Sequence, residues 1–422
     1  MKAYPAYKSS GVEWLEEIPE NWEFRPIKRI FSEVDIKKGD APYPLLSFSR
    51  EKGLIIPPID KKGVPDDLSC YKVLKKGQLL ENRMQAWSGM FICADKDGCV
   101  SPDYSVFEAI DINTTSVKFY EYVFRNHIWV SLFANASKGI GTGFNRLYTP
   151  QFGAIKTIFP PYEEQNVIVA YLDKKCAEIE ELISRRQAII DRLKELKQSI
   201  IADAVTKGLN PDVPMKDSGT AWQGKVPAHW KKNRNKNEIF PKVNHVGDNP
   251  NKLPMLSLTK KGVIVRDLES GKGKFSADES KFLIVEPGDF VFCHYDIQET
   301  PRTVGLSSHL GYITGSYNIY GFKGENSQFF YYLHECFDDR KLLCPLYKGL
   351  RNTIRQDRFL SMRIFLPPAE EQKTIVAYLD KKCGEIDELV ARQEQIIEKL
   401  KELKTSTIAH VVTGKVDVRD AI

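Results

Sequence analysis

The sequence predicts an α+β protein in which two globular α+β domains are separated by two long α-helices that form an antiparallel coiled coil. Three observations support this prediction: a length of 422 residues, a sequence repeat, and heptad patterning within each copy of the repeat. A chain of this length exceeds what one hydrophobic core usually supports, so at least two domains are expected.

The repeat begins at a pair of prolines in each half of the chain. Pro160-Pro161 is followed by YEEQ and then, after one residue, by VIVAYLDKKCAEIEELI. Pro367-Pro368 is followed by AEEQ and then, again after one residue, by TIVAYLDKKCGEIDELV. Weaker echoes lie upstream, where SGVEWLEEIPENW ends at Trp22 and SGTAWQGKVPAHW ends at Trp230. We therefore expect a pseudo-twofold internal repeat of one architecture.

Each repeated segment is predicted to be one continuous helix. Glu163 and Glu164 follow a permissible first-turn proline, which signals a helix start. Apolar residues then recur in sevens, and a second row follows three residues after the first, as in a coiled-coil seam. The predicted coiled-coil interface comprises Leu172, Ile179, Leu182, Arg186, Ile189, Leu193, Leu196, Leu379, Ile386, Leu389, Gln393, Ile396, Leu400 and Leu403.

A polar residue occupies the middle of each seam, Arg186 in the first helix and Gln393 in the second. Polar residues at such positions fix register or orientation. We therefore predict an antiparallel pairing that brings Arg186 and Gln393 near each other.

The segments before each helix have a different pattern. Runs such as YKVLKKGQLL and FLIVEPGDFVF combine apolar and β-branched residues with Gly, Pro and Asp, which indicates strands and turns. One helical patch is expected in each half, around residues 119–133 and around residues 329–342, because apolar residues recur there at helical spacing. The expected limits are a first domain at 1–160, a first helix at 161–207, a second domain at 208–366 and a second helix at 367–414.

Composition and motifs argue against several function classes. A net charge of +5 is only weakly basic, and the eight cysteines form no C-x-x-C pair, which favours reduced thiols and no metal. The N-terminus lacks an apolar signal segment and no apolar run is long enough for a membrane span, so a cytoplasmic location is expected. There is no G-x-x-x-x-G-K-[ST] motif. We predict a non-catalytic chain without a cofactor.

Residues able to contact nucleic acid lie on two predicted loops in each half. Arg, Gln and His can bond base edges, aromatic rings can contact thymine methyl groups, and basic residues beside glycines suit phosphates. The candidate DNA-binding residues are Arg83, Gln85, Trp87, Lys138 and Arg146 in the first half, and His294, Tyr295, Arg302, Lys348, Arg351, Arg355 and Arg358 in the second.

The repeated P-P-x-x-E-Q-x-x-I-V-A-Y-L-D and its heptads resemble the conserved regions of type I restriction-modification specificity subunits. The run Asn82–Gly89 and the run Asp97–Tyr104 also resemble target-recognition domains of that family. The second half departs from this pattern at 292–295 and 314–317, which implies that the two domains read different bases.

The resemblance implies a non-catalytic subunit that reads double-stranded DNA. Each target-recognition domain would read one half of a bipartite asymmetric site, and the helices would set the spacer and dock two modification (methyltransferase) subunits. Restriction subunits, the ATP-dependent motor-nucleases, would complete the complex. The alternatives are a specificity subunit of a related methyltransferase-nuclease that is not type I, a coiled-coil scaffold, and a catalytic methyltransferase.

Overall fold

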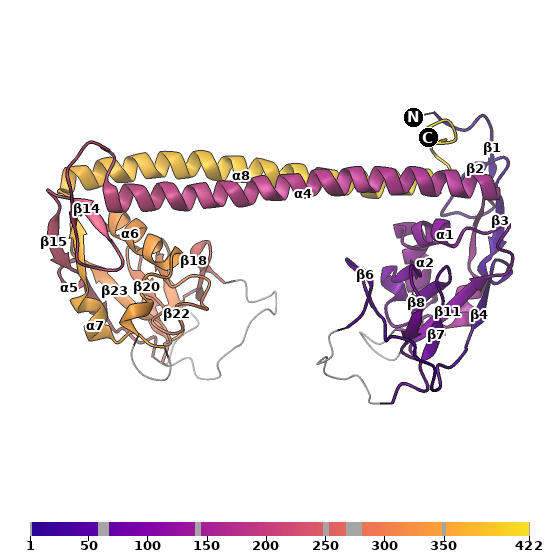
Figure 1. The fold of residues 1–422 in the computed structure, drawn as a ribbon, viewed down its shortest axis with the longest axis horizontal. Coiled ribbons are helices and arrows are strands. Elements are labelled where there is room, and N and C mark those ends of the chain that lie inside the picture. The colour runs from indigo at the N-terminus through magenta and orange to yellow at the C-terminus, as the bar shows by residue number, and fades with distance from the viewer. Residues whose placement is uncertain are drawn as a thin grey trace. The chain divides into compact units, whose positions relative to one another are not determined.

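The protein is described from a computed structural model. The described residues are 2–57, 67–139, 145–247, 253–266, 281–347 and 352–421. The chain forms two compact units: unit 1 comprises residues 1–186 with 395–422, and unit 2 comprises residues 187–394. The two long helices, α4 (Tyr162–Lys207) and α8 (Ala369–Val412), each extend from one unit into the other (Figure 1).

Unit 1 places short antiparallel strands and short helices before α4. Its strands are β1 (Tyr7–Ser9), β2 (Glu17–Pro19), β3 (Glu23–Pro26), β4 (Phe31–Val34), β5 (Ser47–Ser49), β6 (Gly53–Ile55), β7 (Lys72–Leu74), β8 (Leu79–Asn82), β9 (Phe91–Cys93), β10 (Gly98–Val100), β11 (Tyr104–Ala109) and β12 (Lys156–Phe159). Its short helices are η1 (Ile27–Arg29), η2 (Ala86–Ser88), α1 (Val117–Phe124), α2 (His127–Ala136) and α3 (Thr149–Ala154).

Unit 2 repeats this order between α4 and α8. Its strands are β13 (Met215–Asp217), β14 (Lys225–Pro227), β15 (Lys231–Arg234), β16 (Ile239–Lys242), β17 (Leu256–Thr259), β18 (Gly262–Val265), β19 (Leu283–Val285), β20 (Phe290–Phe292), β21 (Val304–Leu306), β22 (Gly311–Ile313), β23 (Asn318–Phe322) and β24 (Arg363–Leu366). Its short helices are α5 (Asn235–Glu238), α6 (Ser327–Asp339), η4 (Cys344–Leu346) and α7 (Gln356–Ser361).

The sheets of the two units have the same topology. The central four-stranded sheet has the order β4-β11-β8-β9 in unit 1 and β16-β23-β20-β21 in unit 2. The two-stranded sheets β12-β3 and β10-β7 return as β15-β24 and β19-β22. The α+β class and the internal duplication predicted from the sequence are therefore confirmed.

The central strands alternate their side chains between two apolar clusters, as a sheet covered on both faces requires. In unit 1, Leu79 and Phe107 pack against the helices, whereas Leu80 and Val106 pack in a smaller cluster on the opposite face. Unit 2 divides the residues of β20 and β23 between two clusters in the same way. The register that pairs Leu79 with Phe107 thus fixes which side chains reach each core.

Within each unit, α4 and α8 run antiparallel. An ion pair joins Lys404 of α8 to Glu180 of α4 in unit 1. In unit 2, Lys197 Nζ lies 2.7 Å from a carboxylate oxygen of Asp387. The residue numbers of each pair add to the same total, so the antiparallel register is the same in both units. The predicted proximity of Arg186 and Gln393 stays a prediction, because these residues belong to different units.

The second row of the predicted seam was placed one residue too early. Leu182, Ile189, Leu196, Leu389 and Leu403, which we expected in the interface, are exposed, and Ile396 is only half-buried. The buried residues instead follow four positions after the first row, at Cys176, Ile190, Cys383 and Ile397. Steps of three and of four both keep residues on one helix face, so apolar character alone did not distinguish the two rows.

The first predicted helical patch, 119–133, is divided into α1 and α2. Asn126 lies between them in an extended conformation, and its side chain accepts a hydrogen bond from the backbone N–H of Ile128 at 3.0 Å. Asparagine is a favoured N-cap, so this residue starts a new helix. The corresponding patch in unit 2 is one helix, α6.

The repeated motif at the start of α4 holds the N-terminal segment against the helix. The buried carboxylate of Glu164 accepts hydrogen bonds from Tyr4 Oη at 2.5 Å, Trp22 Nε1 at 2.8 Å and Asn21 Nδ2 at 2.9 Å. In unit 2, Trp230 Nε1 donates to Glu371 at 3.1 Å. The tryptophan that ends each upstream echo and the second glutamate of each motif are therefore partners.

The glutamine that follows holds a loop in place. Gln165 Oε1 accepts from the backbone N–H of Ser116 at 2.8 Å, and its Nε2 donates to the backbone oxygens of Thr114 and Pro160. Gln372 makes the equivalent bond to Pro367 at 3.0 Å. These contacts explain why Glu and Gln recur at fixed positions after each proline pair.

Among the described residues, no helix combines the length and apolar character needed to cross a membrane.

Replacing Glu164 with Gln tests the anchoring role of this carboxylate. The substitution weakens three hydrogen bonds to a buried charged acceptor, and we expect the free energy of unfolding to fall by about 2–3 kcal/mol. Glu163→Gln is the matched control, because Glu163 is exposed in the same helical turn and should change stability by no more than about 0.5 kcal/mol. Urea denaturation of both variants measures the difference. Equal losses would contradict the anchoring role.

Candidate nucleic-acid interface

In unit 1 the first predicted loop lies at the end of β8, in the central sheet. Asn82 shapes it, since its side-chain oxygen accepts from the backbone N–H of Met84 at 3.2 Å. The indole of Trp87 donates from Nε1 to the backbone oxygen of Met84 at 2.9 Å, yet 44% of Trp87 is exposed. The ring is thus fixed in orientation and open to a ligand.

The two predicted loops of unit 1 are joined to each other. The backbone N–H of Leu147 donates to the backbone oxygen of Arg83 at 3.1 Å, and Arg146 pairs with Asp103 at 3.2 Å. Lys138 and Arg146 form a backbone bridge at the base of the second loop. The structure therefore brings Arg83, Lys138 and Arg146 into one cluster.

The members of this cluster differ in accessibility. Gln85 and Lys138 are exposed, whereas Arg83 uses its guanidinium to bond the backbone oxygens of Pro102 and Asp103. The guanidinium of Arg83 therefore holds the loops in place, and fewer of its N–H groups remain free to bond DNA. Sequence reasoning missed Tyr148, which is 42% exposed directly after the second loop. Its position in the sequence, two residues after the candidate Arg146, could have indicated that Tyr148 lies at the same site.

Unit 2 joins the corresponding loops through equivalent backbone bonds. The N–H of Ile354 donates to the oxygen of His294 at 3.0 Å, as Leu147 does to Arg83, and Tyr295 forms a bridge with Thr353. Tyr295 and Arg355 are exposed on this cluster.

A further arginine of the second predicted loop of unit 2 is held by the backbone. Arg358 donates to the backbone oxygens of Tyr347 and Pro345 at 3.4 and 3.3 Å, which fixes its side chain. Lys348 and Arg351 lie outside the described residues.

His294 is a correction to the predicted set of DNA contacts. Only 3% of it is exposed, and its ring packs against Phe359 and Tyr320 with centroids 4.7 and 6.0 Å away. Burial lowers its pKa to about 4, so the ring is neutral near pH 7. His294 therefore belongs to the core beneath the loops, a position that its sequence neighbours did not reveal.

Arg302 is a second correction. Its side chain is largely buried and lies 2.9 Å from Asp339, 3.4 Å from Asp338 and 3.4 Å from Glu335. Three carboxylates from α6 thus hold the guanidinium inside unit 2. A guanidinium buried in such a cluster is not accessible to a phosphate or a base, so Arg302 joins the segment before β21 to α6 instead.

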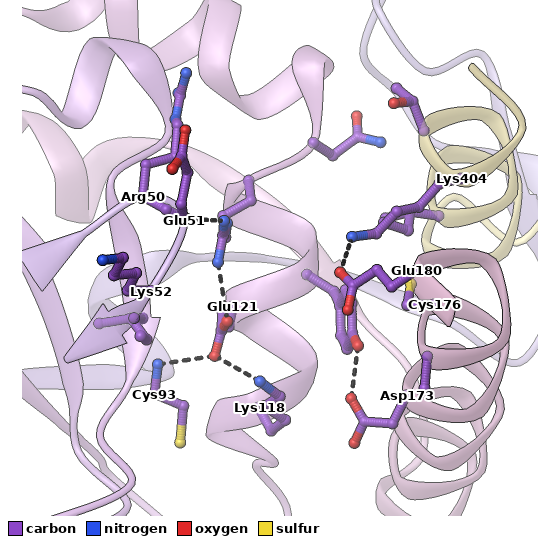
Figure 2. A pocket seen from close by; sticks show the side chains of 18 of the residues that line it. Arg50, Glu51, Lys52, Cys93, Lys118, Glu121, Asp173, Cys176, Glu180 and Lys404 are labelled. Atoms are coloured by element: carbon purple, nitrogen blue, oxygen red, sulfur yellow. Dashed lines mark hydrogen bonds and ion pairs between the residues drawn. The ribbon is translucent and has the colours of Figure 1, made fainter. Parts of the chain in front are cut away.

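A cavity of about 790 Å³ lies in unit 1 between the β5–β6 hairpin, α1 and the helices α4 and α8 (Figure 2). Its charges are matched within the protein: Glu121 accepts from Lys118 Nζ at 3.0 Å and from the backbone N–H of Cys93 at 3.0 Å. Glu180 pairs with Lys404 across the same space. The lining carries equal numbers of basic and acidic side chains, so it has no surplus of one charge to select an ionic ligand.

A tyrosine beside this cavity docks the domain on the long helix. Tyr122 Oη donates to Asp173 at 2.6 Å, and Tyr332 Oη donates to Asp380 at the same distance in unit 2. Burial and the neighbouring carboxylate raise the pKa of both tyrosines, so each hydroxyl remains the donor.

The side chains suited to covalent or metal chemistry are not gathered into a site in the described part of the chain. No group of three His, Cys, Asp or Glu residues there has metal-binding geometry. All eight cysteines are free thiols, and burial raises the pKa of Cys93, Cys336 and Cys383 to about 11. Such thiols are protonated near pH 7 and are poor nucleophiles.

Comparisons with known proteins agree with this arrangement. No family model matches the chain. A putative type I restriction enzyme MjaX specificity subunit from Methanocaldococcus jannaschii is 23% identical over 444 aligned positions, covering 98% of each chain. A chain solved in work on complex assembly and conformational transition of the type I R-M system has a TM-score of 0.67 at 17% identity, covering 94% of this chain and 99% of that one.

A second solved structure, the HsdS subunit from Thermoanaerobacter tengcongensis, has a TM-score of 0.51 at 18% identity and covers 94% of this chain and 98% of its own. At these identities the structural likeness shows a shared fold. The resemblance drawn from the repeated motif is thus confirmed over nearly the whole chain.

The buried histidines of unit 2 predict a pH-dependent stability. Burial lowers the pKa of His334 to about 3 and that of His294 to about 4, so unfolding below pH 6.5 takes up protons that the folded unit excludes. Stability is then full above pH 6.5 and falls by about 1.4 kcal/mol per pH unit for each histidine as the pH drops towards the folded pKa.

His334→Phe provides the test, since Phe124 holds the equivalent place in unit 1. Urea denaturation between pH 7 and pH 5 should show a shallower pH slope for this variant than for the parent protein. An unchanged slope would mean that His334 is protonated in the folded protein.

Proposed function

We propose that this chain is the DNA-recognition subunit of a type I restriction-modification complex, with each α+β domain reading one half of a bipartite asymmetric site. The observation that carries the proposal is a framework built twice with different side chains on its joined loops. Unit 1 presents Gln85, Trp87 and Tyr148 there, whereas unit 2 presents Tyr295 and Arg355. Two domains with the same backbone framework but different loop side chains are suited to reading two half-sites of different base sequence.

The exposed groups have the chemistry that base readout needs. The amide of Gln85 can bond adenine, and the fixed ring of Trp87 can contact a thymine methyl group or an exposed base. Lys138, Arg146 and Arg355 suit phosphate oxygens, which fix the register of the protein on the duplex. The proposed domain limits remain 1–160 and 208–366, with the helices at 161–207 and 367–414.

The exposed apolar residues of the long helices support a second part of the proposal, in which each unit docks one modification subunit. In unit 1, Leu182 and Leu403 share one heptad position, and in an antiparallel pair equal positions flank the same side of the seam. Leu196 and Leu389 repeat this arrangement in unit 2. Exposed apolar patches of this kind mark protein interaction sites.

In this assignment the chain itself is non-catalytic and needs no cofactor. S-adenosylmethionine and the flipped adenine would belong to the modification subunits, and ATP to the restriction subunits. A specificity subunit of a related methyltransferase-nuclease has the same domains, so the subunits that copurify with the chain distinguish the two assignments.

Methylome sequencing tests the function directly. Cells that express this chain with its modification subunit should methylate adenines in a split motif, and a strain lacking this chain should lose that motif. Methylation that stays unchanged without the chain would overturn the proposal.

Trp87→Ala should weaken recognition of one half-site only. Removing the fixed indole should cost about 1–3 kcal/mol of binding to the cognate duplex, or roughly 5- to 150-fold in affinity. Ile112→Ala is the control, since Ile112 is an exposed apolar residue on a different loop. Binding measured with duplexes mutated in each half-site separately assigns the effect. A loss spread equally over both half-sites would count against a reading role for Trp87.

Charged substitutions on the helices should remove modification subunits one at a time. Leu182→Lys with Leu403→Lys alters unit 1, and Leu196→Lys with Leu389→Lys alters unit 2. Because these side chains are exposed, the fold should tolerate the changes. Native mass spectrometry should show two bound subunits for the parent, one for each double variant and none for the combined variant. Two bound subunits in every variant would exclude these residues from docking.

A further inference from the structure

Unit 2 carries a group of cationic residues on one face of the β15–β24 sheet and on α5, which we call the basic face: Lys216, Lys232, Arg234, Lys236 and Arg363. Lys232, Arg234, Lys236 and Arg363 are exposed. Lys216 Nζ lies 5.2 Å from the ring centroid of Phe365, the cross-strand partner of Lys232. Within the described part of the chain, none of the five forms an ion pair with a carboxylate.

Two of these charges directly oppose each other. Arg234 of β15 is the cross-strand partner of Arg363 of β24, and like charges directly opposite on a sheet are destabilising. Lys232 lies on the same face, two residues before Arg234. An external anion would relieve this repulsion.

Unit 1 shows that the sheet does not need this arrangement to fold. There Pro26 stands opposite Lys156, in place of the two arginines. Arg25 on the same strand is paired with Glu23 at 2.7 Å and lies over the ring of Phe159 at 3.8 Å. The direct opposition of two arginines is therefore specific to unit 2, although the two sheets share one topology.

The basic face is continuous with the loops that we assign to DNA reading in unit 2. Asn235 of α5 donates from Nδ2 to the backbone oxygen of Phe359 at 3.1 Å, and its N–H donates to Met362 at 3.1 Å, which binds α5 to α7. Arg355 and Arg358 stand at the start of α7. Figure 1 shows β15, α5 and α7 following one another along one edge of unit 2.

We propose that the basic face binds the phosphate backbone of the DNA duplex that flanks the half-site read by unit 2. This inference rests on the proposed function and extends it to DNA outside the recognised bases. Phosphates along a duplex offer the spaced negative charges that exposed Lys and Arg side chains neutralise. Continuity with the reading loops favours the same duplex over the acidic surface of a protein partner.

The test compares the full chain, assembled with its modification subunits, with a triple variant in which Lys232→Gln, Arg234→Gln and Arg363→Gln are combined. Three duplexes carry the cognate site. The short duplex ends close to the site on both sides, and each of the two long duplexes extends by one helical turn on one side. The parent should gain affinity about tenfold from one of the two extensions. The triple variant should bind the short duplex as the parent does and lose that gain.

Salt dependence provides a second readout. On the long duplex, the slope of log affinity against log salt should be smaller for the variant by about 0.9 for each phosphate that it no longer neutralises. The control variant, with Lys28→Gln, Arg29→Gln and Lys156→Gln, removes three exposed charges from unit 1 and should keep the gain from the flank of unit 2. Thermal melting verifies that both variants fold.

Three outcomes distinguish the possibilities. Retention of the flank gain by the folded triple variant overturns the proposal. If the triple variant keeps the affinity gain but loses a protein subunit from the complex, the proposal is also overturned. The basic face then binds an acidic surface of that protein. A parent complex that shows no sequence-specific binding on either duplex rejects the proposed function itself.

Discussion

The structure depends on the side-chain hydrogen bonds that hold each α+β domain to a long helix. Glu164 accepts three side-chain hydrogen bonds from the N-terminal segment, and Tyr122 donates to Asp173 further along α4. Glu371 and Asp380 accept the corresponding bonds in unit 2. Buried polar groups are costly unless they are paired, so these contacts specify one orientation of the domain on its helix. The proposed reading of two DNA half-sites at a fixed spacing would require this rigidity.

The two units use one framework for different surfaces. Arg83 and His294 occupy equivalent backbone positions, yet the arginine fastens two loops and the histidine fills an aromatic core. Beside these positions, Trp87 is exposed in unit 1 and Tyr295 in unit 2. Because the strands fix the backbone, side chains on the loops can change without disturbing the fold. This separation of framework and reading surface is what a modular recognition subunit requires.

Charge is distributed unevenly between the units, which a net charge of +5 conceals. Most cations on α4 and α8 have an acidic neighbour, as Lys404 has Glu180 and Lys197 has Asp387. Arg234 and Arg363, by contrast, face each other without a carboxylate. Electrostatic attraction to DNA depends on such local surpluses more than on the total.

The sequence by itself determined the duplication, the α+β class and the two long helices, because repeats and heptad spacing are local properties of the chain. It also marked Glu164 and Gln165 by their recurrence, although not the partners that they bind. Tertiary structure decided which loop residues are accessible: His294 and Arg302 looked like DNA contacts but are held by rings and carboxylates from α6 and α7. It also decided that Cys176 is buried and that Leu182 is exposed. Burial depends on segments distant in the sequence, so no local pattern could reveal it.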